Sequence, residues 1–183
     1  MKLHLRTRGV CCVSLLALFA ALAAGAPALR GQAAEKAQVT HGPAQLTISG
    51  DVQKPLTLSL SELRALPRKT ISVNNEHAGE NETYEGVALA ALLKQAGVPQ
   101  GIQVRGKAMA IYVLAEAADG YRVIFSLAEL DTDFENSEVI VADTLDGKPL
   151  GDNFGPLRLV APHDKRPARW VRMLQSIQVV NVK

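Results

Sequence analysis

The side chains best suited to chemistry in this sequence are basic and crowd its C-terminal part. Residues 158–172 contain one acid, Asp164, and five cations: Arg158, Lys165, Arg166, Arg169 and Arg172. Guanidinium and ammonium groups form short charge-assisted hydrogen bonds to phosphate and carboxylate oxygens. The acids gather elsewhere, since residues 129–146 hold seven Asp or Glu and no Lys or Arg. This separation predicts that one end of the folded chain attracts an anion; two solvated faces of opposite charge are the alternative.

The sequence holds no self-sufficient catalytic motif. It has no Gly-rich phosphate loop, no His-x-x-x-His pair and no nucleophile elbow. Beyond the first ten residues the histidines are His41, His77 and His163, which lie far apart in the sequence. They could meet at a metal ion only through the fold, so any active site must be assembled from distant segments.

The N-terminal residues have the pattern of an export signal. Lys2, Arg6 and Arg8 precede an apolar run over residues 10–24, and residues 31–33 (GQA) offer small side chains at the first and third positions. This pattern predicts a secretory signal over residues 1–33, cleaved near Ala33. The protein is then periplasmic or secreted and keeps no stable membrane span. An uncleaved N-terminal anchor is the alternative.

Composition limits what the remaining 150 residues can be. Both cysteines, Cys11 and Cys12, lie inside the predicted signal, so the domain must be stabilised by packing without a disulfide. Residues 1–33 contain four Lys or Arg and no acid, which leaves 16 basic against 18 acidic residues and a formal net charge of −2. A negative net charge argues against a nucleic-acid partner. The length suits one domain with a proper core.

Short strands and helices alternate along the chain. Residues 34–44 are expected to form a flexible lead-in to one domain over residues 45–183. Strands are predicted at 45–49, 56–58, 69–73, 108–115, 121–125, 139–142, 157–160 and 177–182. Ser-x-x-Glu capping boxes at 59–62 and 126–129 each predict a short helix, the leucines of 88–96 predict a third, and a polar loop is expected over 74–82. The fold class is therefore α+β, a single mixed-sheet domain with short helices.

The order of several short motifs resembles a known family. In the second half these motifs are residues 119–121 (DGY), 125–130 (FSLAEL), 146–150 (DGKPL), 155–162 (GPLRLVAP) and 169–172 (RWVR). Upstream, residues 84–87 (YEGV) and the leucines that follow them also match in order. Together they resemble the molybdopterin-binding domain of the sulfite oxidase family. The resemblance covers nearly all of residues 45–182.

The resemblance implies roles for particular residues. In that family the stretch around the Gly-Pro-Leu-Arg motif and the basic segment after it hold the pterin and its phosphate. The matching cofactor-binding residues in this chain are Asn153, Arg158, His163, Lys165 and Arg169. Tyr121 falls where the family places an active-site tyrosine beside the metal, and it is the implied catalytic residue.

The chain departs from the family at the metal ligand. Family enzymes bind molybdenum through a cysteine followed by Ala-Gly, whereas the matching residues 77–79 read HAG. His77 thus stands at or near the metal-ligand position, and a neutral imidazole donates less charge than a thiolate. Bound molybdopterin is expected only if His77 or solvent replaces the thiolate.

Three functions remain open from the sequence. The first is an exported, non-catalytic or altered binding module for an anionic small molecule or a periplasmic protein partner. The second is a periplasmic molybdopterin-dependent oxidoreductase with a non-cysteine metal ligand. The third is an accessory protein without a small-molecule site.

Overall fold

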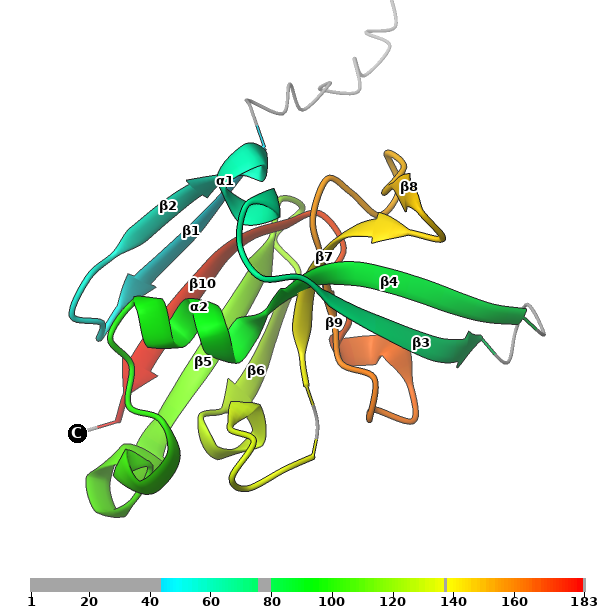
Figure 1. Ribbon diagram of the computed structural model, residues 1–183. Coiled ribbons are helices and arrows are strands. Elements are labelled where there is room, and N and C mark those ends of the chain that lie inside the picture. Colours follow the sequence, from blue (N-terminus) through cyan, green and yellow to red (C-terminus); the bar gives the residue numbers. More distant parts are fainter. Residues whose placement is uncertain (1–43, 76–79, 137, 183) are drawn as a thin grey trace, which may run out of the picture. The chain divides into compact units, whose positions relative to one another are not determined.

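A computed structural model describes residues 44–75, 80–136 and 138–182, whose strands form two sheets (Figure 1). The predicted export signal, residues 34–43 of the lead-in, and His77 lie outside the described residues. Ala44 is described, and its carbonyl accepts a hydrogen bond from the amide of Leu60 at 3.2 Å. No helix among the described residues is long and apolar enough to cross a membrane.

The first sheet has the strand order β2-β1-β10-β5-β6. Its strands are β1 (Gln45–Gly50), β2 (Leu56–Ser59), β5 (Ile111–Ala117), β6 (Arg122–Ser126) and β10 (Leu174–Asn181). β1 runs parallel to β10, with Ile48 opposite Ile177, and the other neighbours are antiparallel. The sheet is therefore mixed, and it brings the two ends of the domain together.

The second sheet carries the strands that border the site. It contains β3 (Lys69–Asn75), β4 (Glu80–Ala88), β7 (Ile140–Leu145) and β8 (Lys148–Pro149) in that order, and β9 (Arg158–Val160) also pairs with β7. All pairs are antiparallel. Asp146 and Gly147 both have positive φ in the turn between β7 and β8, as the predicted Asp-Gly hairpin turn requires.

The helices are short because their sequences end them early. α1 (Leu60–Arg64) begins at the predicted capping box: the Ser59 hydroxyl accepts from the amide of Glu62, whose carboxylate accepts from the amide of Ser59 at 2.8 Å. α2 (Leu89–Gln95) buries its three leucines completely and ends before Gly97, which has a φ of +80°. The remaining helical turns are 3₁₀ segments at Gly101–Gln103, Gly106–Ala110, Ala128–Leu130 and Pro167–Arg169.

Two apolar clusters hold these elements. The larger one joins alternate residues of the first sheet to α2, and β5 shows the alternation plainly because every second side chain is buried. The smaller cluster consists of Tyr84, Ile140, Ala142 and Val160, with Trp170 and parts of β3 packed against it. The smaller cluster fixes the strands around the site.

The α+β prediction with short helices is confirmed, and two local expectations are wrong. At both ends of the predicted polar loop over 74–82 the chain is strand, because β3 continues to Asn75 and β4 starts at Glu80, with Asn74 opposite Asn81; residues 76–79 lie outside the described residues. Pairing with a neighbouring strand satisfies the backbone of this polar sequence. The strand expected at 108–115 begins at Ile111 after a 3₁₀ turn and runs to Ala117.

Candidate anion-binding site

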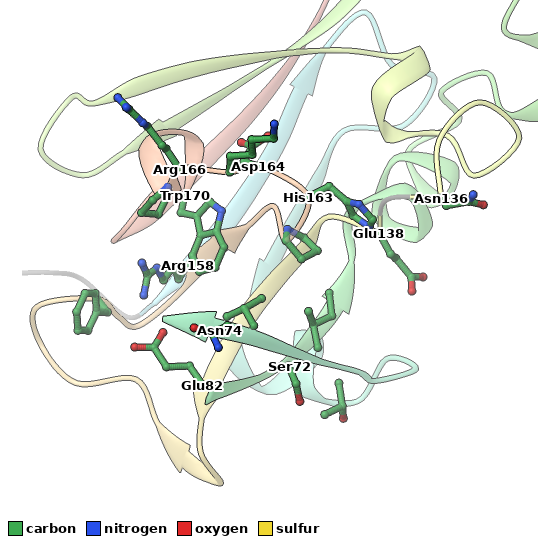
Figure 2. Close-up of a pocket in the computed structure, with 17 residues that line it drawn as sticks. Ser72, Asn74, Glu82, Asn136, Glu138, Arg158, His163, Asp164, Arg166 and Trp170 are labelled. Atoms are coloured by element: carbon green, nitrogen blue, oxygen red, sulfur yellow. The ribbon is translucent and has the colours of Figure 1, made fainter. Parts of the chain in front are cut away.

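A pocket of about 900 Å³ lies between β3 and the segment after β9 (Figure 2). One wall consists of residues 70–74, and the facing wall consists of residues 162–167. The rest of the lining comes from Glu82, Asn136, Glu138, Phe154, Arg158 and Trp170. Its size falls in the range of small-molecule sites.

Arg158 is a buried cation in this lining. It sits at the start of β9, pairs there with Ala142 of β7, and is only 9% exposed. Its guanidinium carbon lies 4.7 to 5.3 Å from the centroids of three aromatic rings: Phe154, Trp170 and Tyr84. Cation–π attraction offsets part of the cost of taking this charge out of water.

The hydrogen bonds of Arg158 are incomplete. Its Nη1 donates to the Tyr84 hydroxyl at 2.6 Å, but its Nε has no hydrogen-bond partner among the described residues. Burial lowers the pKa of Arg158 from its ordinary value, although an arginine remains charged in proteins. A buried, charged N–H without an acceptor is costly and rare. Arg158 therefore lacks an acceptor that a ligand could supply.

Tyr84 connects this cation to a carboxylate. The tyrosine is fully buried, and its hydroxyl accepts a hydrogen bond from Arg158 and donates one to Glu82 Oε2 at 2.7 Å. Burial, together with the hydrogen bond to Glu82, raises the pKa of Tyr84, so the phenol stays neutral. Trp170 meets Tyr84 edge to face at 5.8 Å and donates its indole N–H to the Ala161 carbonyl at 2.8 Å. The cation is thus held by fixed neighbours.

Two further cations of the pocket wall are unpaired. Lys165 and Arg166 are exposed, and neither forms an ion pair with a described residue. The acids nearby have partners of their own. Asp164 binds Arg169 at 2.6 Å, and Glu138 binds Lys69 at 3.0 Å. The free charge of this wall is therefore positive.

The structure brings together part of the predicted site. Arg158, His163 and Lys165 all line the pocket, and Arg166, another of the five cations of residues 158–172, lines it too. Asn153 is exposed and does not line the pocket, whereas its neighbour Phe154 does. The predicted roles in cofactor binding stay predictions.

Arg169 and Tyr121 lie outside the pocket lining. The guanidinium of Arg169 is occupied by two carboxylates, Asp164 and Glu129, and its pKa is raised by these hydrogen bonds. Tyr121 is 48% exposed and donates its hydroxyl to the Ala168 carbonyl. Both residues support the segment 164–169 that carries Lys165 and Arg166.

Sequence reasoning missed the partners of Arg158. Tyr84 and Glu82 are separated from Arg158 by more than seventy residues, so no local pattern joins them. The available signal was the alternation in β4, which places side chains two residues apart on one face of a strand. This alternation predicts that Glu82 and Tyr84 share a face, but it does not say what lies against that face.

Comparison with known proteins now places the chain. The profile of the family described as "Oxidoreductase molybdopterin binding domain" matches residues 35–183. The chain belongs to this family. Among solved structures it is similar to the sulfane dehydrogenase SoxCD from Paracoccus pantotrophus, at 23% identity and a TM-score of 0.59. That match covers 75% of this chain and 38% of the SoxCD chain, so this chain spans well under half of that neighbour. A search of curated proteins gave no match.

The described lining of the pocket fits the phosphate of the family's cofactor better than its metal. A phosphate would find the guanidinium of Arg158, together with Lys165 and Arg166, which pair with no other described residue. No cysteine is among the described residues of the lining, and the cysteines of the chain are Cys11 and Cys12, inside the predicted signal. Among the described residues, no group of three or more His, Cys, Asp or Glu is placed to hold a metal. The described lining therefore offers donors for an anion and no thiolate for molybdenum.

Proposed function

We propose that this chain is an exported member of its family that works as a binding module for an anionic ligand, without thiolate-bound molybdenum. The observation that carries the proposal is the buried Arg158, which lines the pocket and whose Nε has no hydrogen-bond partner among the described residues. An anion there would accept from Arg158 and gain attraction from Lys165 and Arg166. Export rests on the pattern of residues 1–33 alone.

The pocket can recognise an anion without covalent chemistry. Phe154, Trp170 and Tyr84 surround the guanidinium and limit its access to water, and hydrogen bonds between charged groups are stronger away from water. The outer cations attract the ligand, and the inner one orients it. Specificity then depends on whether the ligand can reach Arg158, because only that contact satisfies a buried donor.

Calorimetry with inorganic pyrophosphate tests the proposal. We expect saturable binding that the double variant Lys165→Gln/Arg166→Gln weakens by about tenfold or more, since each hydrogen bond to a charged group contributes roughly 1.5–3 kcal/mol. The matched control is Arg105→Gln/Lys107→Gln, two exposed cations outside the pocket lining. Equal weakening by both double variants would show only a general charge effect and would contradict the site.

The second candidate is an oxidoreductase that uses His77 as a metal ligand. It is favoured by family membership and by the place of His77 in the sequence between β3 and β4, two strands that line the pocket. Metal and pterin analysis of protein purified from the extracytoplasmic compartment of its host decides between the two. Stoichiometric molybdenum and pterin, with the metal lost in His77→Ala, would establish this candidate and refute the first. Absence of both supports the binding module.

A further inference from the structure

β3 is an edge strand that no other described strand covers. It pairs with β4 along its whole length, from Lys69 opposite Gly86 to Asn75 opposite Glu80. No backbone hydrogen bond from another described segment reaches it. In Figure 1, β3 lies between β4 and the orange segment that follows β9. Its outer edge therefore presents a row of unpaired N–H and C=O groups toward that segment.

The pocket covers one face of β3 and also reaches the outer edge of the strand. Successive side chains of a strand point to opposite faces. Ile71 and Val73 pack on the cluster around Tyr84, whereas Ser72 lies on the other face, with its hydroxyl 3.3 Å from that of Thr83. All five residues from 70 to 74 nevertheless line the pocket. A surface touched by both faces must include the backbone edge between them.

The wall opposite this edge selects a charge. It presents Lys165 and Arg166, which form no ion pair with another described residue, and Arg158 lies deeper in the same pocket. The strand itself lacks the usual protection of an edge, since residues 69–75 contain no proline and a single charge at Lys69. The groove thus combines a pairing edge with an unbalanced positive wall.

We infer that the ligand of this pocket is an extended peptide with acidic side chains, which adds a strand to β3. Backbone hydrogen bonds to the edge would provide affinity, and one or two carboxylates on Lys165, Arg166 or Arg158 would provide specificity. Five strand residues span about 16 Å, so a segment of about five residues fills the edge. The inference rests on the proposed function, because the same cations bind the ligand in both.

A second copy of this chain is a poorer occupant. Symmetric pairing of two β3 edges would bring each strand into the groove of the other copy. Residues 69–75 contain no Asp or Glu, and their one charged side chain, Lys69, already pairs with Glu138, so β3 of a second copy would bring no negative charge to Lys165 and Arg166. An acidic segment has the opposite sign and is favoured by complementarity.

A randomised octapeptide library displayed against the purified full chain tests the inference. We expect enriched peptides that contain Asp or Glu among β-branched residues.

The best peptide is then synthesised in versions that are N-methylated at one position each. In a strand pairing, only alternate amides face the partner, so methylation should weaken binding at least tenfold at every second position and little at the others. Lys165→Gln/Arg166→Gln should also weaken binding tenfold, and Arg105→Gln/Lys107→Gln less than twofold.

Each other outcome has a defined meaning. The inference is overturned if the loss of binding on N-methylation does not alternate from one position to the next. It is also overturned if the enriched peptides bind both double variants equally. Pyrophosphate binding without any enriched peptide overturns this inference and leaves the proposed function standing, whereas failure of both probes overturns both. A dimer in sedimentation that Val73→Lys disrupts, together with no peptide binding, identifies a second copy as the occupant and also overturns the inference.

Discussion

Replacing Arg158 with Met tests whether this arginine binds the ligand or only stabilises the fold. Methionine keeps an unbranched apolar stem and removes the charge. The variant loses the bond to Tyr84, worth roughly 1.5–3 kcal/mol, and cation–π attraction of roughly 0.5–2 kcal/mol. It also removes an unsatisfied Nε, which costs roughly 1–3 kcal/mol, and the burial of a charge, which costs several kcal/mol. These contributions nearly cancel.

We therefore expect Arg158→Met to fold with a free energy of unfolding within about 1 kcal/mol of the parent chain. The effect on ligand binding should be large. Pyrophosphate at a hundred times its Kd stabilises a folded protein by about 2.7 kcal/mol, or roughly 10 °C in Tm for a domain of this size. The Met variant should lose nearly all of this shift.

Thermal unfolding with and without pyrophosphate measures both quantities. Arg122→Met is the matched control, because Arg122 is exposed, pairs with Glu116 at 2.8 Å, and lies outside the pocket lining. It should keep the full ligand shift. Arg158→Met could instead lower the free energy of unfolding by about 3 kcal/mol or more and keep the rise in Tm with pyrophosphate. Arg158 would then only stabilise the fold, and the reasoning about its Nε would be refuted.

Two further predictions concern the strands that frame the pocket. Burial would raise the pKa of Asp143, which is 2% exposed, but two hydrogen bonds from Arg68 at 2.6 and 2.9 Å help hold it below its usual value. This stabilisation is complete above the unfolded pKa of about 3.9 and is lost as the pH falls through the lower folded value. Asp143→Asn should therefore lower the free energy of unfolding by about 2–4 kcal/mol at neutral pH. Its urea-unfolding curve should approach that of the parent chain in acid. A difference in stability that does not change with pH would exclude the ion pair as the cause. Gly86→Ala should destabilise the fold by about 1–3 kcal/mol, because the added Cβ would lie 2.1 Å from the Val141 carbonyl oxygen. At Gly151 an added Cβ has no neighbour within 4 Å, so Gly151→Ala should leave the stability unchanged. Comparable losses in the two glycine variants would refute the packing argument.

Local sequence predicted the secondary structure well where the physics is local. A capping box needs only a Ser and a Glu three residues apart, and both predicted boxes form, at Ser59 and at Ser126. The second opens only a 3₁₀ turn, Ala128–Leu130, because Asp131 follows in extended conformation. The same local view predicted a loop at residues 74–75 and 80–82, which are strand, since polar side chains alone do not reveal that a neighbouring strand will pair with them.

The sequence by itself determined the family and the existence of a cationic cluster near the C-terminus. The order of short motifs carried the family, and charge composition does not depend on the fold. Tertiary structure decided which cations are available. Arg169 is neutralised by Glu129, forty residues away, whereas Lys165 forms no ion pair within the part of the chain that the structure describes. Their similar charges in the sequence gave no way to tell them apart.

Tertiary structure also decided what surrounds the site. Arg158 meets Tyr84 across 74 residues because β9 and β4 both pair with β7, and β3 is an edge because no further strand continues the sheet among the described residues. Periodicity within a strand or helix acts over a few residues, so a sequence pattern can assign a side chain to a face. Which face meets which depends on the register of whole sheets, and register is set by the packing of the complete core.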